Sequence, residues 1–252
     1  MTQEKQKLVW IIGASTGIGA ELAVQMANAG RKIIISARNE QKLLEVCANN
    51  PQNIISLPLD VTKKEDVQAV FDRIEYEFGE VECAIISAGT YIRDNPRNFD
   101  VKIFEDLFAL NVMGNMNCLG AIIPRMVARE CGQIAVISSV AGYVGLPFAA
   151  AYGGTKAALM NICESLYPYL KRHGIDLKLI NPGFVKTPLT AKNKFPMPFL
   201  IDVDEAARII IKKLKTKDFE IIFPWKMAFY IKLLHALPNF LRLKFTSLIL
   251  KD

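Results

Sequence analysis

Short apolar runs alternate with longer helical segments along most of this chain. The runs with strand character cover residues 7–12, 32–36, 53–57, 82–87, 133–138, 175–180 and 220–223. The segments with helical character cover residues 20–29, 40–48, 62–78, 101–129, 150–173 and 203–216. Alternation at this spacing predicts an α/β fold, in which right-handed crossovers place helices on both faces of a doubly wound parallel sheet. We therefore expect a three-layer structure.

The length and composition are those of one large domain. A chain of 252 residues, 51% of them hydrophobic, can bury a sizeable core, and it contains no internal repeat or linker. Its polar start, residues 1–7, lacks the apolar segment of a secretion signal. Five scattered cysteines without a C-x-x-C pair, and only two histidines, indicate reduced thiols in a cytosol-like compartment and argue against a metal site. We expect a cytoplasmic protein.

A glycine-rich turn connects the first expected strand to the first expected helix. Its glycines follow the pattern G-x-x-x-G-x-G, and the residues concerned are Gly13, Ser15, Thr16, Gly17, Ile18 and Gly19. Glycine lets the backbone approach a pyrophosphate closely, and the N-terminus of a helix attracts the anion. The unit predicts a dinucleotide site. The alternative is a tight strand–helix turn that binds no ligand.

The residues after the second and third expected strands indicate which dinucleotide is bound. An NAD enzyme places an acid after the second strand to bind the ribose 2′-hydroxyl, whereas this chain has Arg38 and Asn39 there. Because a guanidinium matches the geometry of a 2′-phosphate, we expect NADP(H) in preference to NAD(H). Arg38 could instead be a surface residue of the next helix. Asp60, followed by Val61, either accepts a hydrogen bond from the adenine amino group or caps a turn.

Tyr152 and Lys156 are four residues apart in an expected helix that begins near Ala150. Positions i and i+4 share a helix face, so both side chains can point to one place. An ammonium beside a phenol favours the phenolate, and we expect Lys156 to lower the pKa of Tyr152 into the range of a general acid or base. Read alone, the pair is equally consistent with a helix that carries one aromatic residue and one solvated lysine.

Taken together, these motifs resemble the short-chain dehydrogenase/reductase family. The residues that follow its order and spacing are Gly13, Gly17, Gly19, Asp60, Ala88, Gly89, Asn111, Ser139, Tyr152, Lys156, Pro182 and Gly183. The resemblance covers residues 7–223, nearly the whole chain. It implies a single-domain Rossmann-type enzyme that transfers hydride between NAD(P)(H) and an alcohol or carbonyl compound. It also implies residues 1–224 as the catalytic domain.

The resemblance assigns roles to matching positions. It implies Tyr152 as the general acid/base, Lys156 as the residue that tunes Tyr152 and holds the nicotinamide ribose, and Ser139 as the hydroxyl that polarises the substrate oxygen. It implies that Asn111 holds a water in a kinked helix and that Thr187 binds the carboxamide, while Ser138 is structural. The cofactor-binding set that it implies is Gly13, Ser15, Thr16, Gly17, Ile18, Gly19, Arg38, Asn39, Asp60, Val61, Ala88, Gly89, Asn111, Tyr152, Lys156, Pro182, Gly183, Val185 and Thr187.

Some positions depart from the family pattern. Ile12 stands where a threonine usually precedes the first glycine, and Ile86 and Ser87 replace two asparagines before Ala88. These changes affect hydrogen bonds that brace the sheet and leave the reacting groups in place. Thr16 is not the basic residue that some NADP enzymes have before the second glycine, so the preference for NADP(H) depends on Arg38.

The C-terminal segment, residues 225–252, is apolar with scattered basic residues, and Pro238 divides it into two short helices. Each is shorter than the roughly 20 residues that span a bilayer. Lysines beside Phe, Leu and Trp suit a helix that lies in an anionic membrane interface. The alternatives are that this extension covers the substrate cleft or joins subunits in a homodimer or homotetramer. It supplies +4 of the net charge of +6, so the body is nearly neutral and we expect no nucleic-acid partner.

The loop at 187–201 contains Phe195, Met197, Phe199 and Leu200, which predict an apolar substrate pocket. We therefore expect a small lipophilic carbonyl or alcohol as the substrate, within lipid metabolism. One alternative is a 3-oxoacyl-thioester reductase of lipid synthesis, which would use the same catalytic residues. Lys192 and Lys194 are the only candidates for the basic patch that such a substrate favours. A second alternative is a non-enzymatic NADP(H)-binding protein that docks on membranes.

Overall fold

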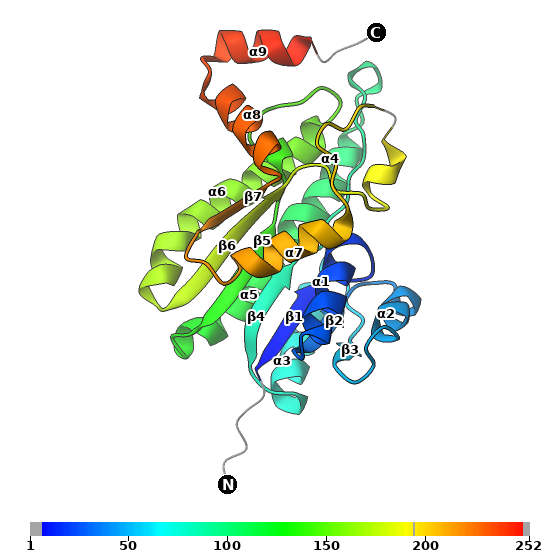
Figure 1. Cartoon of the computed structure of the whole chain (residues 1–252), viewed down its shortest axis with the longest axis vertical. Coiled ribbons are helices and arrows are strands. Elements are labelled where there is room, and N and C mark those ends of the chain that lie inside the picture. Colours follow the sequence, from blue (N-terminus) through cyan, green and yellow to red (C-terminus); the bar gives the residue numbers. More distant parts are fainter. Residues whose placement is uncertain (1–6, 194, 249–252) are drawn as a thin grey trace.

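The computed structural model describes residues 7–193 and 195–248. Within them, seven parallel strands form one sheet in the order β3-β2-β1-β4-β5-β6-β7 (Figure 1). The strands are β1 Leu8–Ile12, β2 Lys32–Ser36, β3 Ile54–Ser56, β4 Val81–Ile86, β5 Gly132–Ile137, β6 Ile175–Pro182 and β7 Glu220–Phe223. The order reverses between β1 and β4, and ligands bind outside the carboxyl ends of the strands at such a point.

Helices cover both faces of the sheet (Figure 1). One face packs against α1 Gly17–Asn28, α2 Glu40–Cys47 and α7 Val203–Lys213. The other packs against α3 Lys64–Glu77, α5 Gly114–Ala128 and α6 Ala150–Arg172. The predicted three-layer, doubly wound parallel sheet in a single domain is therefore confirmed.

Strand β1 shows why the sheet is buried on both faces. Val9 and Ile11 join the core under α1 and α7, whereas Trp10 and Ile12 join the core under α3 and α5, and all four are fully buried. The Trp10 ring stacks on Phe71 with 5.6 Å between centroids. A continuous apolar strand of this kind is typical of a parallel sheet between two helical layers.

The helix expected at 101–129 is divided in the structure, although not at the residues Gly114, Gly120 and Pro124, which the sequence offers as interruptions. It consists of α4 Val101–Leu107, a π-helical turn η2 Phe108–Met113, and α5. The break therefore precedes Gly114, and Pro124 lies inside α5. The segment Val101–Ala128 is long and apolar enough to cross a membrane, but half of its apolar window is buried inside the fold. We interpret it as a core helix.

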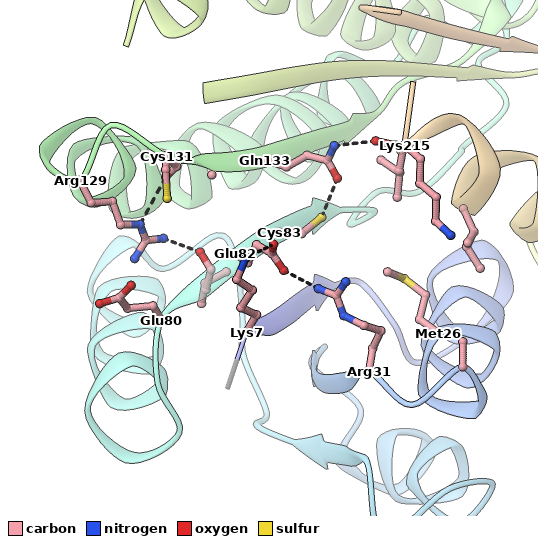
Figure 2. A pocket seen from close by; sticks show the side chains of 15 residues that line it. Lys7, Met26, Arg31, Glu80, Glu82, Cys83, Arg129, Cys131, Gln133 and Lys215 are labelled. Atoms are coloured by element: carbon pink, nitrogen blue, oxygen red, sulfur yellow. Dashed lines mark hydrogen bonds and ion pairs between the residues drawn. The ribbon is translucent and has the colours of Figure 1, made fainter. Parts of the chain in front are cut away.

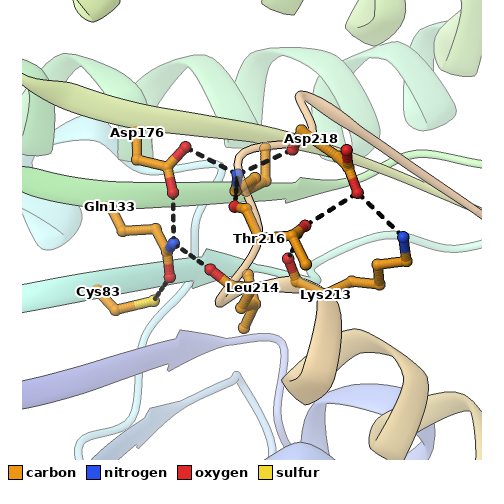
Figure 3. A network of polar contacts seen from close by, with 8 residues as sticks. Cys83, Gln133, Asp176, Lys213, Leu214, Thr216 and Asp218 are labelled. Carbon is orange, nitrogen blue, oxygen red and sulfur yellow. Dashed lines mark hydrogen bonds and ion pairs between the residues drawn. The ribbon is translucent and has the colours of Figure 1, made fainter.

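The last crossover is held by a fully buried lysine, whose partners Asp176, Thr216 and Asp218 are labelled in Figure 3. Lys178 Nζ on β6 donates to the carbonyl oxygens of Thr216 at 2.6 Å and Asp218 at 2.8 Å, and it pairs with Asp176 Oδ1 at 2.9 Å. Three acceptors compensate for the burial of the ammonium. The contacts fix the turn between α7 and β7 against the sheet.

The C-terminal extension forms α8 Trp225–Ala236 and α9 Asn239–Ser247, with the break that Pro238 predicted. Both lie beyond the carboxyl end of the sheet, on the side away from the N-terminus (Figure 1). On α8, Met227 and Ile231 pack against Val140 and Val144 in the segment that follows β5. The extension therefore sits next to the edge of the sheet at which ligands are expected.

Candidate active site

The glycine turn has no space for side chains at two of its positions. Gly13 has φ +86°, and a Cβ there would lie 2.5 Å from the Ala88 backbone nitrogen; a Cβ at Gly19 would lie 2.5 Å from the Gly13 oxygen. Gly17 has φ +62° and begins α1. These positions require glycine because they bring β1, β4 and α1 together at one point.

The N-terminus of α1 is free to receive an anion. Thr16 occupies the N-cap position without a side-chain capping bond, and the first turn of α1 carries no acidic residue. Ser15 and Ile18 are partly exposed beside it. Thr187 approaches from the loop after β6, because its Cγ2 lies 3.4 Å from where a Cβ of Gly17 would be. The amides of this turn therefore remain available to a phosphate.

The ends of β2 and β3 place a cation and an anion near each other. Arg38 is exposed, and Asn39 caps α2 by accepting a bond from the Lys42 amide at 3.0 Å. Asp60 Oδ1 accepts from the amide and the hydroxyl of Thr62 at 3.0 and 2.8 Å. Burial works against the charged carboxylate, but the Thr62 bonds and the charges of Arg38 and Lys63 outweigh it and lower the Asp60 pKa. Of the two predictions for Asp60, the structure shows the capped turn.

Val61, which follows, is buried, and its carbonyl oxygen accepts a bond from Asn117 Nδ2 at 2.9 Å. The Val61 side chain also lies against Gly114, where a Cβ would be only 2.7 Å from Val61 Cγ2. The segment that follows β3 is thus packed directly on α5.

Asn111 connects the π turn to the loop after β4. Its Nδ2 donates to Thr90 O at 2.9 Å and Thr155 Oγ1 at 3.2 Å, while its Oδ1 accepts from the Thr90 amide at 2.8 Å. The side chain is completely buried. A Cβ at Gly89 would lie 3.3 Å from Asn111 Oδ1 and 3.5 Å from Lys156 Nζ. The kink expected at Asn111 is present as the π-helical turn η2. It places Asn111 within reach of both the loop after β4 and α6.

Helix α6 begins at Ala150, as expected, and brings Tyr152 and Lys156 to the end of β5. Lys156 is buried, its Nζ donates to Ile137 O at 3.1 Å, and it lies 5.7 Å from the centroid of the Tyr152 ring. Ser139 follows β5 and hydrogen-bonds with Tyr152. Ser138 is buried instead, and its Oγ donates to the Lys156 carbonyl at 3.0 Å. Ser139, Tyr152 and Lys156 thus form one cluster, braced by Ser138.

The prediction that Lys156 lowers the pKa of Tyr152 is wrong for this arrangement. Burial raises the pKa of Tyr152 above its usual value; the bond with Ser139 lowers it, and the neighbouring phenol of Tyr91 raises it. Burial also lowers the pKa of Lys156 to about 8. The physical reason is that the ammonium turns toward Ile137 O, and desolvation therefore dominates both groups.

The loop after β6 closes the site on the other side. Pro182 ends β6, and the Gly183 amide donates to Phe223 O at 2.7 Å. Val185 is buried and pairs with Ile201 in an isolated bridge, while Thr187 N donates to Thr190 Oγ1 at 3.0 Å. These contacts hold Thr187 over the glycine turn. Lys194, proposed for a basic patch, lies outside the described residues.

Four residues that sequence reasoning missed surround the cluster. Tyr91 meets Tyr152 edge to face with 5.2 Å between ring centroids. The amide of Thr90 donates to the Asn111 side chain, and the carbonyl of Thr90 accepts from it. Asp94 is buried and accepts from the Ala151 amide at the start of α6. Asn115 Nδ2 donates to Ala88 O and to Asn111 O. Only Asn115, four residues after Asn111 on an expected helix, carried a sequence signal.

A cavity of about 610 Å³ lies at the opposite end of the sheet (Figure 2). It is at the amino ends of β1, β4 and β5, where Glu82 pairs with Arg31 at 2.6 Å and with Lys7 at 3.4 Å. Cys83 Sγ donates to Gln133 Oε1 at 3.3 Å. The polar groups in this cavity form ion pairs and hydrogen bonds with one another, and the glycine turn lies at the other edge of the sheet. We therefore assign this cavity no part in the candidate active site.

The described residues contain no group of three or more His, Cys, Asp or Glu side chains that could hold a metal ion. Their arrangement offers instead an anion site at the N-terminus of α1 and, at the carboxyl end of β5, hydroxyl groups beside a buried amine. Such a site can bind a phosphate-bearing cofactor and move a proton at a substrate oxygen.

Comparisons with known proteins agree with this arrangement. The sequence model described as short chain dehydrogenase matches residues 7–196. An uncharacterized oxidoreductase of Myxococcus xanthus is 32% identical over 242 residues, which cover 95% of this chain and 96% of that protein. A short-chain dehydrogenase structure from Streptomyces avermitilis superposes with a TM-score of 0.82 at 24% identity, over 90% of this chain and 91% of that one. The structure of ElxO with NADP bound superposes with a TM-score of 0.78 at 23% identity, over 86% and 96%.

Proposed function

The chain belongs to the short-chain dehydrogenase family, and we propose that it is an oxidoreductase that transfers hydride between NADP(H) and a lipophilic carbonyl compound or secondary alcohol. The observation that carries this proposal is the clustering of Ser139, Tyr152 and Lys156 at the carboxyl end of β5, the same edge of the sheet as the glycine turn. We place the catalytic domain at residues 1–224 and treat residues 225–252 as its extension.

The residues at this edge of the sheet fit a nicotinamide dinucleotide. The open N-terminus of α1 suits its pyrophosphate, and Gly89 lies close to Asn111 and Lys156, since a Cβ there would be 3.3 Å from Asn111 Oδ1 and 3.5 Å from Lys156 Nζ. When bound, the cofactor supplies the hydride chemistry. The proposed binding set is Gly13, Ser15, Thr16, Gly17, Ile18, Gly19, Arg38, Asn39, Asp60, Val61, Ala88, Gly89, Asn111, Tyr152, Lys156, Pro182, Gly183, Val185 and Thr187.

Arg38 supports NADP(H) in preference to NAD(H). Its guanidinium is exposed at the end of β2, where it acts on the carboxylate of Asp60. A guanidinium at this point can bind a 2′-phosphate through paired hydrogen bonds. ElxO, which shares the fold, is described with NADP bound, and this agrees with the proposal for the present chain.

The protein groups act on the substrate oxygen. Tyr152 and Ser139 share a hydrogen bond and can both donate to an oxygen that gains negative charge in reduction. Tyr152 then gives up its proton as the general acid. Lys156 is buried beside the Tyr152 ring, and its proposed role is to hold the nicotinamide ribose. In oxidation the same groups act in reverse, with Tyr152 as the base.

An apolar substrate is supported by apolar side chains on the loops after β4 and β6. Tyr91 lies against Tyr152, and the loop before α7 contributes Phe195, Phe199 and Leu200, all of them exposed. Phe195 also meets Phe184 with 6.0 Å between ring centroids. These side chains favour a lipophilic compound over a sugar or a charged acid. Assembly into a homodimer or homotetramer and peripheral membrane contact remain predictions.

The variant Tyr152→Phe tests the proposal. It keeps the ring and removes the phenol, so NADPH binding, measured by calorimetry, should stay within about threefold of wild type, whereas turnover on a panel of lipophilic ketones and aldehydes should fall by about 10²-fold or more. The matched control is Tyr169→Phe, on the exposed side of α6. Equal turnover by Tyr152→Phe and wild type would remove Tyr152 from its proposed role.

A further inference from the structure

An apolar surface extends along the two C-terminal helices. Eight large side chains there are each more than half exposed, namely Trp225, Phe229, Tyr230, Leu233, Phe240, Leu243, Phe245 and Leu248. Single exposed apolar residues are ordinary on a protein surface, whereas a contiguous group of this size marks an interaction site. We call the outer side of α8 and α9, together with the loop at 195–200, the docking surface.

Helix α8 has an inner side and an outer side. Met227 and Ile231 are buried against Val140 and Val144, and His235 Nδ1 contacts the Tyr143 carbonyl oxygen at 2.8 Å. Trp225, Phe229 and Leu233 follow one another at intervals of four residues on the other side, as on one stripe of a helix. The inner contacts fix the position of α8, so the outer stripe is exposed in the folded protein.

The loop at 195–200 continues this surface. Phe199 stacks on Tyr230 with 5.8 Å between ring centroids and an angle of 6° between the planes. Phe199 and Leu200 are 37% and 41% exposed, so the contact with α8 leaves part of each free. The docking surface therefore joins two segments that are about thirty residues apart in the sequence.

Positive charge accompanies these apolar groups. Lys226, Arg242 and Lys244 lie on α8 and α9, and the sequence from 221 to 251 contains no acidic residue. Lys232 is neutralised by Glu220 at 2.6 Å, whereas the partners of Arg242 among residues 7–193 and 195–248 are neutral, namely Asn239 Oδ1 and the His235 carbonyl. Lys226 Nζ lies 5.7 Å from the centroid of the Trp225 ring, so this cation and this aromatic ring belong to the same patch of surface.

We propose that the docking surface binds an anionic lipid bilayer, with α8 and α9 lying in the interface. Aromatic and leucine side chains would enter the boundary of the acyl chains, and Lys226, Arg242 and Lys244 would meet the phosphates. A second copy of the chain fits this surface less well. A twofold contact would bring the same cations together without an acidic partner on α8 or α9, and like charges repel. The proposal concerns binding and does not depend on the reaction.

Vesicle co-sedimentation tests the proposal with the full-length chain. Wild type should bind vesicles of phosphatidylcholine and phosphatidylserine at least about tenfold more tightly than vesicles of phosphatidylcholine alone, since each basic group near an anionic surface contributes about 1 kcal/mol. The double variant Lys226→Glu/Lys244→Glu should lose about tenfold or more in affinity for the anionic vesicles. The double variant Phe229→Ser/Phe240→Ser should lose binding to the same extent.

Matched controls separate this surface from general effects. Leu44→Ser/Tyr76→Ser removes two exposed apolar side chains on α2 and α3, and Lys42→Glu/Lys64→Glu reverses two charges there; both should bind vesicles like wild type. Thermal unfolding shows whether each variant is folded. Sedimentation velocity without vesicles reports self-association. The proposal would be overturned if the wild-type protein did not bind anionic vesicles. It would also be overturned if Phe229→Ser/Phe240→Ser dissociated a dimer while vesicle binding persisted.

Discussion

The Asp94 carboxylate accepts a hydrogen bond from the Ala151 amide, with 2.9 Å between Asp94 Oδ2 and the Ala151 nitrogen. Asp94 belongs to the loop after β4, whereas Ala151 is in the first turn of α6, one residue before Tyr152. The residue at the N-cap position, Ala149, offers no side-chain acceptor. A buried acid from a distant loop therefore accepts a hydrogen bond from a free amide of the first turn of α6. This contact fixes the position of the turn that carries Tyr152.

We predict that Asp94→Ala lowers the free energy of unfolding by about 1–2 kcal/mol, because an N-terminal amide and the helix dipole lose their partner. Asp94→Asn keeps an acceptor oxygen and should lose less. Urea unfolding measures both. If Asp94→Ala were as stable as wild type and equally active, the contact would have no role in positioning α6.

The phenol of Tyr91 should tune the acid–base behaviour of Tyr152. Its proximity raises the pKa of Tyr152, so Tyr91→Phe should lower that pKa. In the reductive direction Tyr152 acts in its protonated form, and activity falls as pH rises through its pKa. The basic limb of the kcat/KM profile of Tyr91→Phe should therefore move to lower pH. A basic limb that stays in place would show that the two phenols are not coupled.

Ser139 should act on the same pKa in the opposite direction. Its hydrogen bond lowers the pKa of Tyr152, so Ser139→Ala should move the basic limb to higher pH. The loss of a donor to the substrate oxygen should also reduce kcat by about 10²-fold or more. Ser138→Ala is the comparison, because Ser138 Oγ bonds only the Lys156 carbonyl in the structure. A pH profile of Ser139→Ala identical to that of wild type would contradict this account.

The buried Lys156 should make stability depend on pH. Burial lowers its pKa from 10.5 to about 8, so the unfolded chain binds more protons than the folded one between these values. The free energy of unfolding should thus rise with pH across this window, by about 3 kcal/mol from this group. Lys156→Met should lack that part of the rise, whereas Lys42→Met, on the exposed side of α2, should retain it. Denaturant titrations at several pH values give both slopes, and parallel slopes for wild type and Lys156→Met would reject the prediction.

Arg38 should determine the choice of cofactor. Arg38→Asp removes a cation that suits a 2′-phosphate and adds an acid that suits a 2′-hydroxyl. The ratio of kcat/KM with NADPH to kcat/KM with NADH should fall by about 10²-fold or more, since charge-assisted hydrogen bonds contribute about 1.5–3 kcal/mol each and repulsion is added. An unchanged ratio would mean that another group selects the cofactor.

The strands, the glycine turn and the start of α6 were predictable because each depends on local pattern: apolar runs, glycine spacing and i,i+4 pairs. The bond between Asp94 and Ala151 was not, since it joins residues that are 57 positions apart. The pKa of Tyr152 was mispredicted for a related reason. Spacing places Lys156 on the same helix face but does not reveal that its ammonium turns to Ile137 O. The family resemblance implied a kink at Asn111, but not that it is a π-helical turn over Phe108–Met113 or that Asn111 bonds Thr90, 21 positions away.

The C-terminal extension shows the same limit. The sequence predicted two helices and their break at Pro238, but not which side of each would be buried. That outcome depends on the groove beside Val140 and Val144, which only the folded segment after β5 creates. Apolar composition alone could not separate the inner residues of α8, Met227 and Ile231, from the outer ones.

The most direct test of the account is the transfer of deuterium from NADPH labelled at the reactive position of its nicotinamide ring. With a lipophilic ketone or aldehyde as substrate, mass spectrometry should find one deuterium on the former carbonyl carbon of the product of the wild-type protein. Tyr152→Phe should bind the labelled cofactor and form almost no labelled product. The contradicting result is a wild-type protein that binds NADPH but transfers no label to any carbonyl compound of the panel, or a Tyr152→Phe variant that transfers it as fast as wild type.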